Sequence, residues 1–368
     1  GIEKSFDKRL KDGRDKLMLT LDKNLQFIIR NELLNAQKIF KNIGGAGILM
    51  NINTGEILSL VSVPDFDLNS REQISDISFI NRATKGVYEL GSVFKSFTIG
   101  AALDYGLISP KDMFLNLEKK MKCGGRIISE YDENLPKDLS VEDILVHSSN
   151  IGSVKIGQII GQEKLRQFLE KIGILGKINF DIEEIGRPLP IKWRDCKLKT
   201  VSYGHGITTT PIQLAKGYAI LANGGYDVKP TLVKKEFYNL KRKRILNKNV
   251  SSQINTMFRK VVQKGTATLS DVDGYEVGGK TGTAQIVEKG VYTNKKINTF
   301  SSIFPSSNPK YVLVVLLEDT KLSKDYVYKY RNKPGSYKGT PFNTAGWTSV
   351  EISGKIIDKI GPILATKY

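Results

Sequence analysis

A serine followed three residues later by a lysine is the simplest pattern in this sequence that could support nucleophilic catalysis. It occurs three times, at Ser5/Lys8, Ser92/Lys95 and Ser307/Lys310. Of these, Ser92 opens a dense apolar segment, and helical spacing would put Lys95 one turn further on, on the same face as the hydroxyl. A serine nucleophile needs a base within hydrogen-bond reach, and a lysine can serve if burial and neighbouring positive charge disfavour its protonated form. We therefore single out Ser92 and Lys95 as a candidate nucleophile and base.

A second pattern, Ser-x-Asn, could contact a peptide-like substrate. It occurs at Ser148/Asn150, between two predicted helices, and again in a proline-flanked turn at Ser306/Asn308. Asn150 offers both a donor and an acceptor, which is the pairing that a peptide bond requires. The first copy is therefore the candidate for a position facing a cleft.

A third motif, Lys-Thr-Gly, occurs once, in the sequence Lys280-Thr281-Gly282-Thr283. It is predicted at the start of a strand, directly after two glycines, where free backbone amides could pair with an extended peptide. Gly282 would let another backbone approach closely. Lys280 and the two threonine hydroxyls would form a carboxylate-binding cluster.

The elements that must position these residues follow from hydrophobic periodicity and turn chemistry. Asp22 is expected to cap a helix that ends at Gly44 and Gly45. The other expected helices are at residues 93–105, at 250–262, at 345–360 and, almost without interruption, at 140–221. A hairpin is expected at residues 48–63, a loop at 318–343, and strands at 275–277, 283–287, 299–304 and 311–317. The fold class is therefore α/β (α+β), with an antiparallel sheet flanked by helices and a mostly helical part.

Composition limits the classes of protein that the chain can represent. Its 368 residues are 40% hydrophobic and 26% charged, which is typical of a globular protein rather than a disordered one. The longest apolar run, residues 311–317, is far shorter than the ~20 residues of a membrane-spanning helix. A net charge of +18 predicts attraction to a polyanion, which could be nucleic acid, an acidic lipid surface or a phosphorylated substrate. Two cysteines are too few for a disulfide-rich scaffold, and a bridge between Cys123 and Cys196 is left open.

The three motifs occur in the order found in penicillin-binding proteins and class A β-lactamases. They are separated by 56 residues from Ser92 to Ser148 and by 130 residues from Asn150 to Lys280, which suits that fold. The chain resembles most closely the transpeptidase domain of class B penicillin-binding proteins of the septal, cell-division type. Leu90 departs from the family, which commonly has proline there. The resemblance extends over blocks at residues 19–26, 47–65, 88–95, 202–207, 210–214 and 344–347.

The resemblance implies a penicillin-binding protein/serine β-lactamase-like transpeptidase fold and a place at the periplasmic face of the bacterial inner membrane. Residues 1–20 would be the remnant of a pedestal preceded by a membrane helix, and residues 21–368 the transpeptidase domain. Within it, residues 46–65 and 227–368 would supply the sheet and residues 107–226 the helical subdomain. Implied partners are the D-alanyl-D-alanine ends of peptidoglycan stem peptides, β-lactams, a membrane glycosyltransferase and other division proteins, but not nucleic acid. The positive charge would then face an anionic bilayer.

The resemblance also assigns a role to each motif residue, with no metal or organic cofactor. Ser92 would attack the substrate carbonyl, Lys95 would take its proton, and Ser148 would relay a proton to the leaving amine. The substrate would be held by Asn150 at its amide and by Lys280, Thr281 and Thr283 at its terminal carboxylate, and Gly282 would let it approach the strand closely. The amides of Ser92 and Thr283 would form the oxyanion hole.

Two other functions share parts of this pattern. A serine β-lactamase has the same motifs, but the Glu-x-x-Leu-Asn of class A is absent between Asn150 and Lys280. A non-catalytic sensor of β-lactams, or a scaffold, stays open because motifs alone do not establish turnover. A Ser-His-Asp triad is disfavoured: His147 is expected to pack or hydrogen-bond, and His205 to shape a turn between two glycines.

Overall fold

The computed structural model describes residues 1–13, 16–67, 78, 80–193, 196–234, 242–288 and 290–367. Its centre is a five-stranded antiparallel sheet in the order β2-β1-β9-β8-β7. The strands are β1 (Gly44–Asn51), β2 (Ile57–Val63), β7 (Gly278–Glu288), β8 (Val291–Phe304) and β9 (Tyr311–Glu318). As expected, strands from the two ends of the chain meet, because β1 pairs with β9 from Gly44 opposite Glu318 to Asn51 opposite Tyr311. The order leaves β7 as an edge strand.

Helices cover both faces of the sheet. On one face, α3 (Lys23–Phe40) packs against β2 and against α11 (Ser349–Lys367), which also contacts β8 and β9. Asp22 caps α3 by accepting the backbone N–H groups of Asn24 and Leu25, as predicted. On the other face, the apolar helix α9 (Pro211–Ala222) packs against β1, β8 and β9, beside α10 (Lys248–Lys264). The two helical layers bury the apolar side chains of β1 and β9 almost completely.

A helical lobe lies beyond the edge strand β7. Its helices are α4 (Lys95–Asp104), α5 (Val141–Val146), α6 (Asn150–Ile160), α7 (Gln162–Lys171) and α8 (Lys197–Ser202). Two small two-stranded antiparallel sheets flank these helices. One pairs β3 (Met113–Phe114) with β6 (Leu139–Ser140), and the other pairs β4 (Lys120–Cys123) with β5 (Arg126–Ser129). A disulfide joins Cys123, at the end of β4, to Cys196, which precedes α8. The sequence left this bridge open, and the structure contains it.

Five of the predicted elements differ from the elements in the structure. Gly44 and Gly45 begin β1 instead of ending α3, which stops at Lys41 in the left-handed conformation (φ 50°). A glycine is needed at residue 44 because a Cβ there would lie 2.1 Å from Nε of the buried Arg82. The segment 275–277 is not a strand, since Glu276 is left-handed (φ 44°), and β7 begins only at Gly278. The loop at 318–343 contains the hairpin of β10 (Val327–Lys329) and β11 (Ser336–Lys338).

The fourth error concerns residues 140–221, which are not almost wholly helical. No helix occurs between Ile172 and Cys196 in the residues that the structure describes there. Gly173 and Gly176 have positive φ angles of 80° and 79°, and Pro188 and Pro190 donate no backbone hydrogen bond. The helix predicted at residues 345–360 begins instead with the 3-10 turn η5 (Ala345–Trp347), and α11 follows it.

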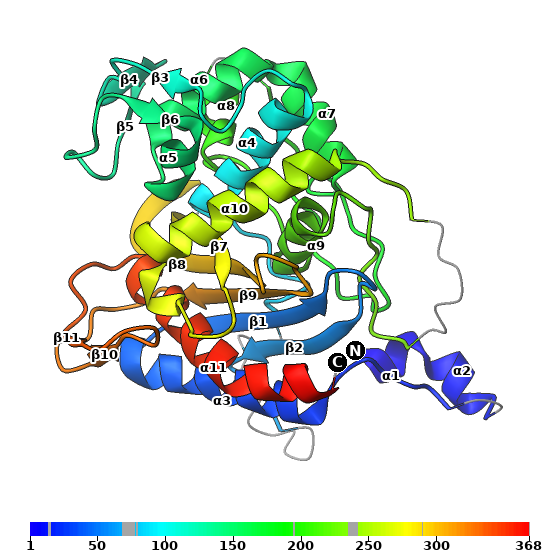
Figure 1. Ribbon diagram of the computed structural model, residues 1–368. Coiled ribbons are helices and arrows are strands. Elements are labelled where there is room, and N and C mark those ends of the chain that lie inside the picture. Colours follow the sequence, from blue (N-terminus) through cyan, green and yellow to red (C-terminus); the bar gives the residue numbers. More distant parts are fainter. Residues whose placement is uncertain are drawn as a thin grey trace.

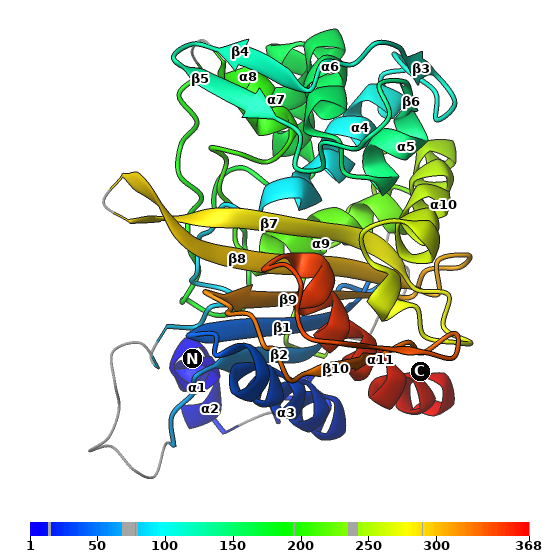
Figure 2. The ribbon, with the colours of Figure 1, turned by 90° about the vertical axis from the view of Figure 1, so that its left-hand side faces the viewer.

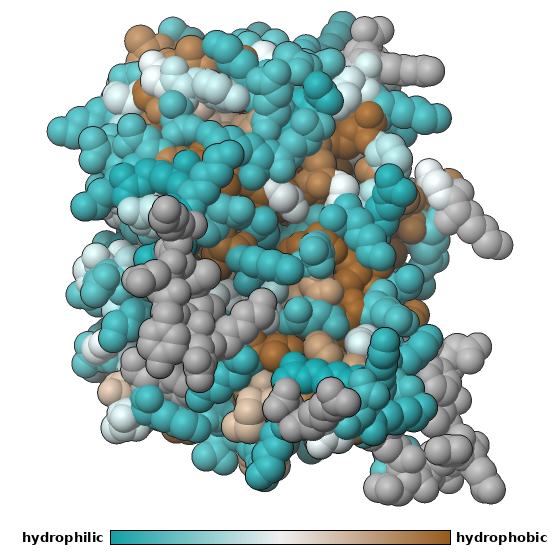
Figure 3. All heavy atoms as spheres, turned by 90° about the vertical axis from the view of Figure 1, so that its right-hand side faces the viewer, coloured by the Kyte–Doolittle hydropathy of each residue, from teal (hydrophilic) through white to brown (hydrophobic). Residues whose placement is uncertain are grey.

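The face that Figure 3 shows is mostly hydrophilic, with apolar side chains gathered in patches. A short segment before the sheet forms α1 (Ile2–Ser5) and α2 (Asp7–Lys11). Within the described ranges, no helix is both long and apolar enough to span a bilayer.

Candidate active site

The nucleophile candidate Ser92 lies on the 3-10 turn η3 (Gly91–Phe94), which leads directly into α4. This turn is pressed against β7. A Cβ at Gly282 would lie 2.1 Å from the carbonyl oxygen of Leu90, and a Cβ at Gly91 would lie 2.6 Å from the carbonyl oxygen of Thr283. Both positions therefore require glycine, and their close approach brings the first and third motifs together. Ser92 itself is partly exposed, and its hydroxyl makes no hydrogen bond with a described residue.

Lys95 follows one turn later and is completely buried. Its Nζ donates to the carbonyl oxygen of Ser148 at 2.5 Å, to Ser148 Oγ at 3.0 Å and to Asn150 Oδ1 at 2.8 Å. Burial lowers the pKa of Lys95 to about 7, because the ammonium form is desolvated, and the charge of Glu130 opposes that shift. Near neutral pH this amine can therefore exist in the form that accepts a proton.

Lys280 lies on the other side of the same serine and is also completely buried. Its Nζ donates to Ser148 Oγ at 2.9 Å and to the carbonyl oxygen of Thr281 at 3.1 Å. Burial, and then the nearby charge of Lys95, lowers the pKa of Lys280. The Ser148 hydroxyl thus bridges two lysine amines, which provides a continuous path for a proton across the site.

The Ser-x-Asn motif is held in place by Glu130, a residue that the sequence analysis missed. Ser149 caps α6 by accepting the N–H of Gly152, and it donates its hydroxyl to Glu130 at 2.6 Å. Glu130 also accepts the backbone N–H groups of Asn150 at 2.7 Å and Ile151 at 3.0 Å. A carboxylate at a helix N-terminus is a stabilising arrangement. No sequence signal links Glu130 to a motif about twenty residues later.

The two threonines of the third motif are held by residues from distant segments. Thr281 shares a hydroxyl hydrogen bond with Thr266 at 2.7 Å. The Thr283 hydroxyl donates to Asn298 Oδ1 at 3.0 Å and accepts the N–H of Ala345 at 2.9 Å. Thr266 and Asn298 were not found from the sequence. The structure therefore brings all eight predicted site residues to one junction, between β7 and the helical lobe.

Neither histidine completes a catalytic triad. His147 is exposed. His205 is stacked between Tyr203 and Tyr292, with ring centroids 5.9 Å and 4.7 Å apart, and burial lowers its pKa. Among the described residues, neither histidine hydrogen-bonds to Ser92.

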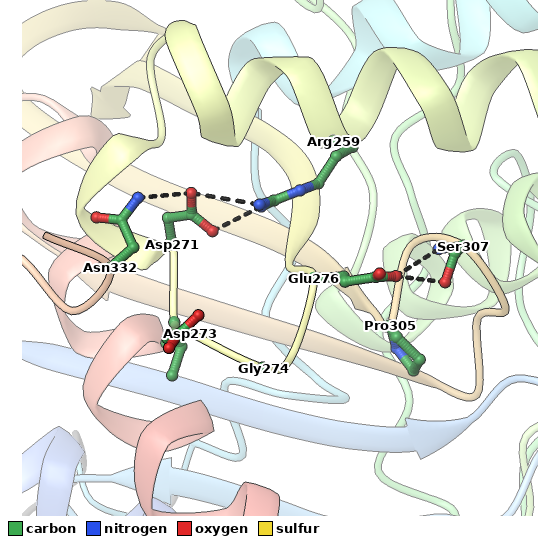
Figure 4. A pocket seen from close by; sticks show the side chains of 9 residues that line it. Arg259, Asp271, Asp273, Gly274, Glu276, Pro305, Ser307 and Asn332 are labelled. Atoms are coloured by element: carbon green, nitrogen blue, oxygen red, sulfur yellow. Dashed lines mark hydrogen bonds and ion pairs between the residues drawn. The ribbon is translucent and has the colours of Figure 1, made fainter.

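A cavity of about 590 Å³ lies elsewhere, near the start of β7, and shares no lining residue with the motif cluster. Figure 4 shows its polar side chains directed toward one another. Arg259 donates to Asp271 at 2.6 Å, and Asn332 donates to the same carboxylate at 2.8 Å. Arg259, Asp271 and Asn332 therefore satisfy one another. The described residues contain no cluster of three His, Cys, Asp or Glu side chains that could hold a metal ion.

The fold and the site identify the class of protein to which the chain belongs. An antiparallel sheet with a helical lobe over its edge strand is also the arrangement in the transpeptidase domain of a penicillin-binding protein. The family described as "Penicillin binding protein transpeptidase domain" matches residues 45–337. The chain therefore belongs to the transpeptidase-domain family of penicillin-binding proteins, within class B.

Individual relatives support this assignment. The chain is 30% identical over 362 residues to the probable peptidoglycan D,D-transpeptidase FtsI of Caulobacter vibrioides, covering 95% of this chain and 59% of that protein. It is 31% identical over 314 residues to the probable peptidoglycan D,D-transpeptidase PenA of Neisseria flavescens, covering 84% and 77%. The transpeptidase domain of Burkholderia pseudomallei penicillin-binding protein 3 has a similar structure, with a TM-score of 0.79, 26% identity and coverage of 94% and 96%. The chain thus spans only part of the length of the Caulobacter relative.

Proposed function

We propose that this chain is the catalytic domain of a peptidoglycan D,D-transpeptidase that cross-links stem peptides during septal cell-wall synthesis, and that β-lactams acylate it covalently. The observation that carries the proposal is the hydrogen-bonded cluster of Lys95, Ser148 and Lys280. Both lysines are fully buried, and Lys95 lies one helical turn after Ser92. It supplies an amine whose pKa of about 7 matches the task of a general base. The related D,D-transpeptidases named above support the same reaction.

In the first half-reaction, Ser92 Oγ forms a bond to the carbonyl carbon of the penultimate D-alanine. Lys95 takes the hydroxyl proton, and the amides of Ser92 and Thr283 stabilise the oxyanion, a contribution of about 3 kcal/mol per donor. The C–N bond to the terminal D-alanine then breaks, and the proton reaches the leaving amine through Ser148. An amine of a neighbouring stem attacks the ester, and its proton returns to Ser92 through Lys95.

The remaining residues bind the substrate. Asn150 holds the substrate amide with the N–H that it does not donate to Ser129 O. Lys280, Thr281 and Thr283 bind the terminal carboxylate, and Gly282 lets the strand approach the nucleophile turn. The charge of Lys95 in turn adds to burial in lowering the pKa of Lys280. No metal or organic cofactor takes part in these steps.

The hydrolase alternative is not favoured. A β-lactamase needs a carboxylate that activates water for deacylation. Glu130 is the carboxylate whose charge acts on Lys95, and its oxygens are occupied by three donors. We therefore propose slow hydrolysis and efficient transfer to an amine.

For the longer protein, we propose that residues 1–20 end a pedestal domain and that residues 21–368 form the transpeptidase domain. Its sheet would come from residues 46–65 and 227–368, and its helical subdomain from residues 107–226. The whole protein would be anchored by an N-terminal membrane helix at the periplasmic face of the inner membrane. It would work with a membrane glycosyltransferase and other division proteins. The net charge of +18 supports a position beside an anionic bilayer.

The test is a transfer assay with a thioester donor that ends in D-alanine and with a D-amino acid as the acceptor amine. We expect the donor to be joined to the acceptor, and the product to be absent with Ser92→Ala. Release of the free acid alone, unaffected by acceptor concentration, would contradict transpeptidation. Absence of both products would support the non-catalytic alternative.

A further inference from the structure

A second cavity has a volume of about 550 Å³. Its walls come from the β4–β5 hairpin, the start of α8, the segment that follows α8, and β8. We call it the hairpin pocket and define it by six of its lining residues, Arg126, Lys192, Lys197, Tyr203, His205 and Tyr292. The disulfide between β4 and the start of α8 joins two of these walls. None of the motif residues lines the pocket.

The hairpin pocket nevertheless lies next to the nucleophile turn. Gly204, between two lining residues, lies so close to the nucleophile turn that a Cβ there would be 1.9 Å from the carbonyl oxygen of Gly91. Tyr292 lies opposite Val287 of β7, and its hydroxyl donates to Glu89 at 3.2 Å. Glu89 precedes Ser92 by three residues. The pocket therefore adjoins Ser92 along the course of β7.

The charge that lines the hairpin pocket is positive. Arg126 lies over the ring of Tyr292, 6.0 Å from its centroid, and Lys197 Nζ donates to the carbonyl oxygen of Gly206 at 2.9 Å. Neither Arg126 nor Lys192 forms an ion pair with a described residue, and the described lining residues include no Asp or Glu. The charges of Arg126 and Lys197 add to burial in lowering the pKa of His205, while Glu89 opposes them. The pocket is thus suited to an anionic group.

The direction of the edge strand indicates which group could reach the pocket. The free edge of β7 runs from Lys280 and Thr281, past Thr283 opposite the nucleophile turn, toward Val287. A peptide with its terminal carboxylate at Lys280 and its scissile carbonyl at Ser92 continues along this edge, at about 3.3 Å per residue. The residue before the two terminal D-alanines therefore comes next to the hairpin pocket.

We propose that the hairpin pocket binds a carboxylate on the substrate, an inference that rests on the proposed transpeptidase function. This carboxylate belongs to the side chain of the donor residue that precedes the two terminal D-alanines. Arg126 and Lys192 supply the charge, and Lys197 adds the N–H groups that it does not donate to Gly206. The interaction is a charge-assisted hydrogen bond at a partly exposed site, so it selects among donors and takes no part in the chemistry.

The experiment compares two thioester donors that differ only in whether this side chain ends in a carboxylate or in a carboxamide. The readout is the ratio of the rates of thiol release at low donor concentration. We expect the carboxylate donor to be favoured about fivefold at low salt, with the ratio falling toward one as salt screens the charges. Arg126→Gln and Lys192→Gln should each reduce the ratio. Lys164→Gln, which removes the same charge from an exposed position on α7, should leave it unchanged.

A variant that reverses the charge of the pocket provides a second test. Arg126→Glu should make a donor whose side chain ends in an amine react faster than the carboxylate donor, and its thermal midpoint reports whether the variant folds. Equal rates for the carboxylate and carboxamide donors in the unaltered chain, with a penicillin adduct still formed at Ser92, would overturn the pocket assignment alone. Failure of both donors and of penicillin would overturn the proposed function, and the pocket assignment with it.

Discussion

The rate of Ser92 acylation should report the ionisation of Lys95. Burial lowers the pKa of Lys95 to about 7. Since only the neutral amine can accept the Ser92 proton, its fraction rises from about 9% at pH 6 to about 50% at pH 7 and about 91% at pH 8. The second-order rate constant for acylation by a penicillin is therefore expected to rise about tenfold between pH 6 and pH 8.

Glu130→Gln is the perturbation that tests this assignment. It removes the negative charge that favours the ammonium form of Lys95, so the pKa of Lys95 falls and the rising limb moves to lower pH. A glutamine cannot serve all three donors that Glu130 accepts, and the free energy of unfolding should also fall by about 1–3 kcal/mol. The assay is the rate of loss of unacylated protein from pH 5.5 to about pH 9, the range that brackets the pKa of Lys95.

The control is Lys280→Arg, in which the second buried cation cannot lose its proton. The rising limb should persist in this variant, and its loss would assign the titration to Lys280. An acylation rate that stays constant between pH 6 and pH 8 in the unaltered chain would contradict the assignment of Lys95 as the base. So would a rise in rate that moves to higher pH in Glu130→Gln.

Three further outcomes follow from the structure. Cys123→Ser removes a disulfide with a sequence separation of 73 residues, and the chain-entropy model predicts that the free energy of unfolding falls by about 4 kcal/mol. Urea unfolding measures this change, and an unaltered free energy of unfolding would contradict the prediction. Gly282→Ala places a methyl group against the Leu90 carbonyl and should slow penicillin acylation at least about tenfold, as the nucleophile turn and β7 separate. Asn298→Ala leaves the Thr283 hydroxyl without its acceptor and should cost about 1–3 kcal/mol of stability and slow acylation, and an unchanged rate would argue against a positioning role.

The sequence predicts which side chains meet at the candidate site better than it predicts the boundaries of the elements. Ser92 and Lys95 are one helical turn apart, so local spacing alone fixes their relation. The helix α10 could likewise be found from periodicity, because it is one continuous amphipathic segment. The first hairpin could be found from two apolar, β-branched runs on either side of a turn. In contrast, the pattern around Gly44 and Gly45 predicts the end of a helix, because the buried Arg82 that requires a glycine at residue 44 comes from a later part of the chain.

Long-range contacts explain what the sequence could not reveal about the site. Thr266 and Asn298 lie 15 residues before Thr281 and 15 residues after Thr283, and they reach the motif only through the turn before β7 and the pairing of β7 with β8. Glu130 reaches the Ser-x-Asn motif through the short β4–β5 hairpin. The hairpin pocket combines segments that no local pattern links. Each of these relations depends on tertiary packing, which local spacing does not encode.

Acylation of Ser92 can be measured by intact mass after incubation with a penicillin, followed by peptide mapping. We expect one adduct of the mass of the antibiotic, located on Ser92, absent in Ser92→Ala and persisting for hours because deacylation lacks an activated water. No adduct, an adduct that survives Ser92→Ala, or rapid turnover of the antibiotic would contradict this expectation.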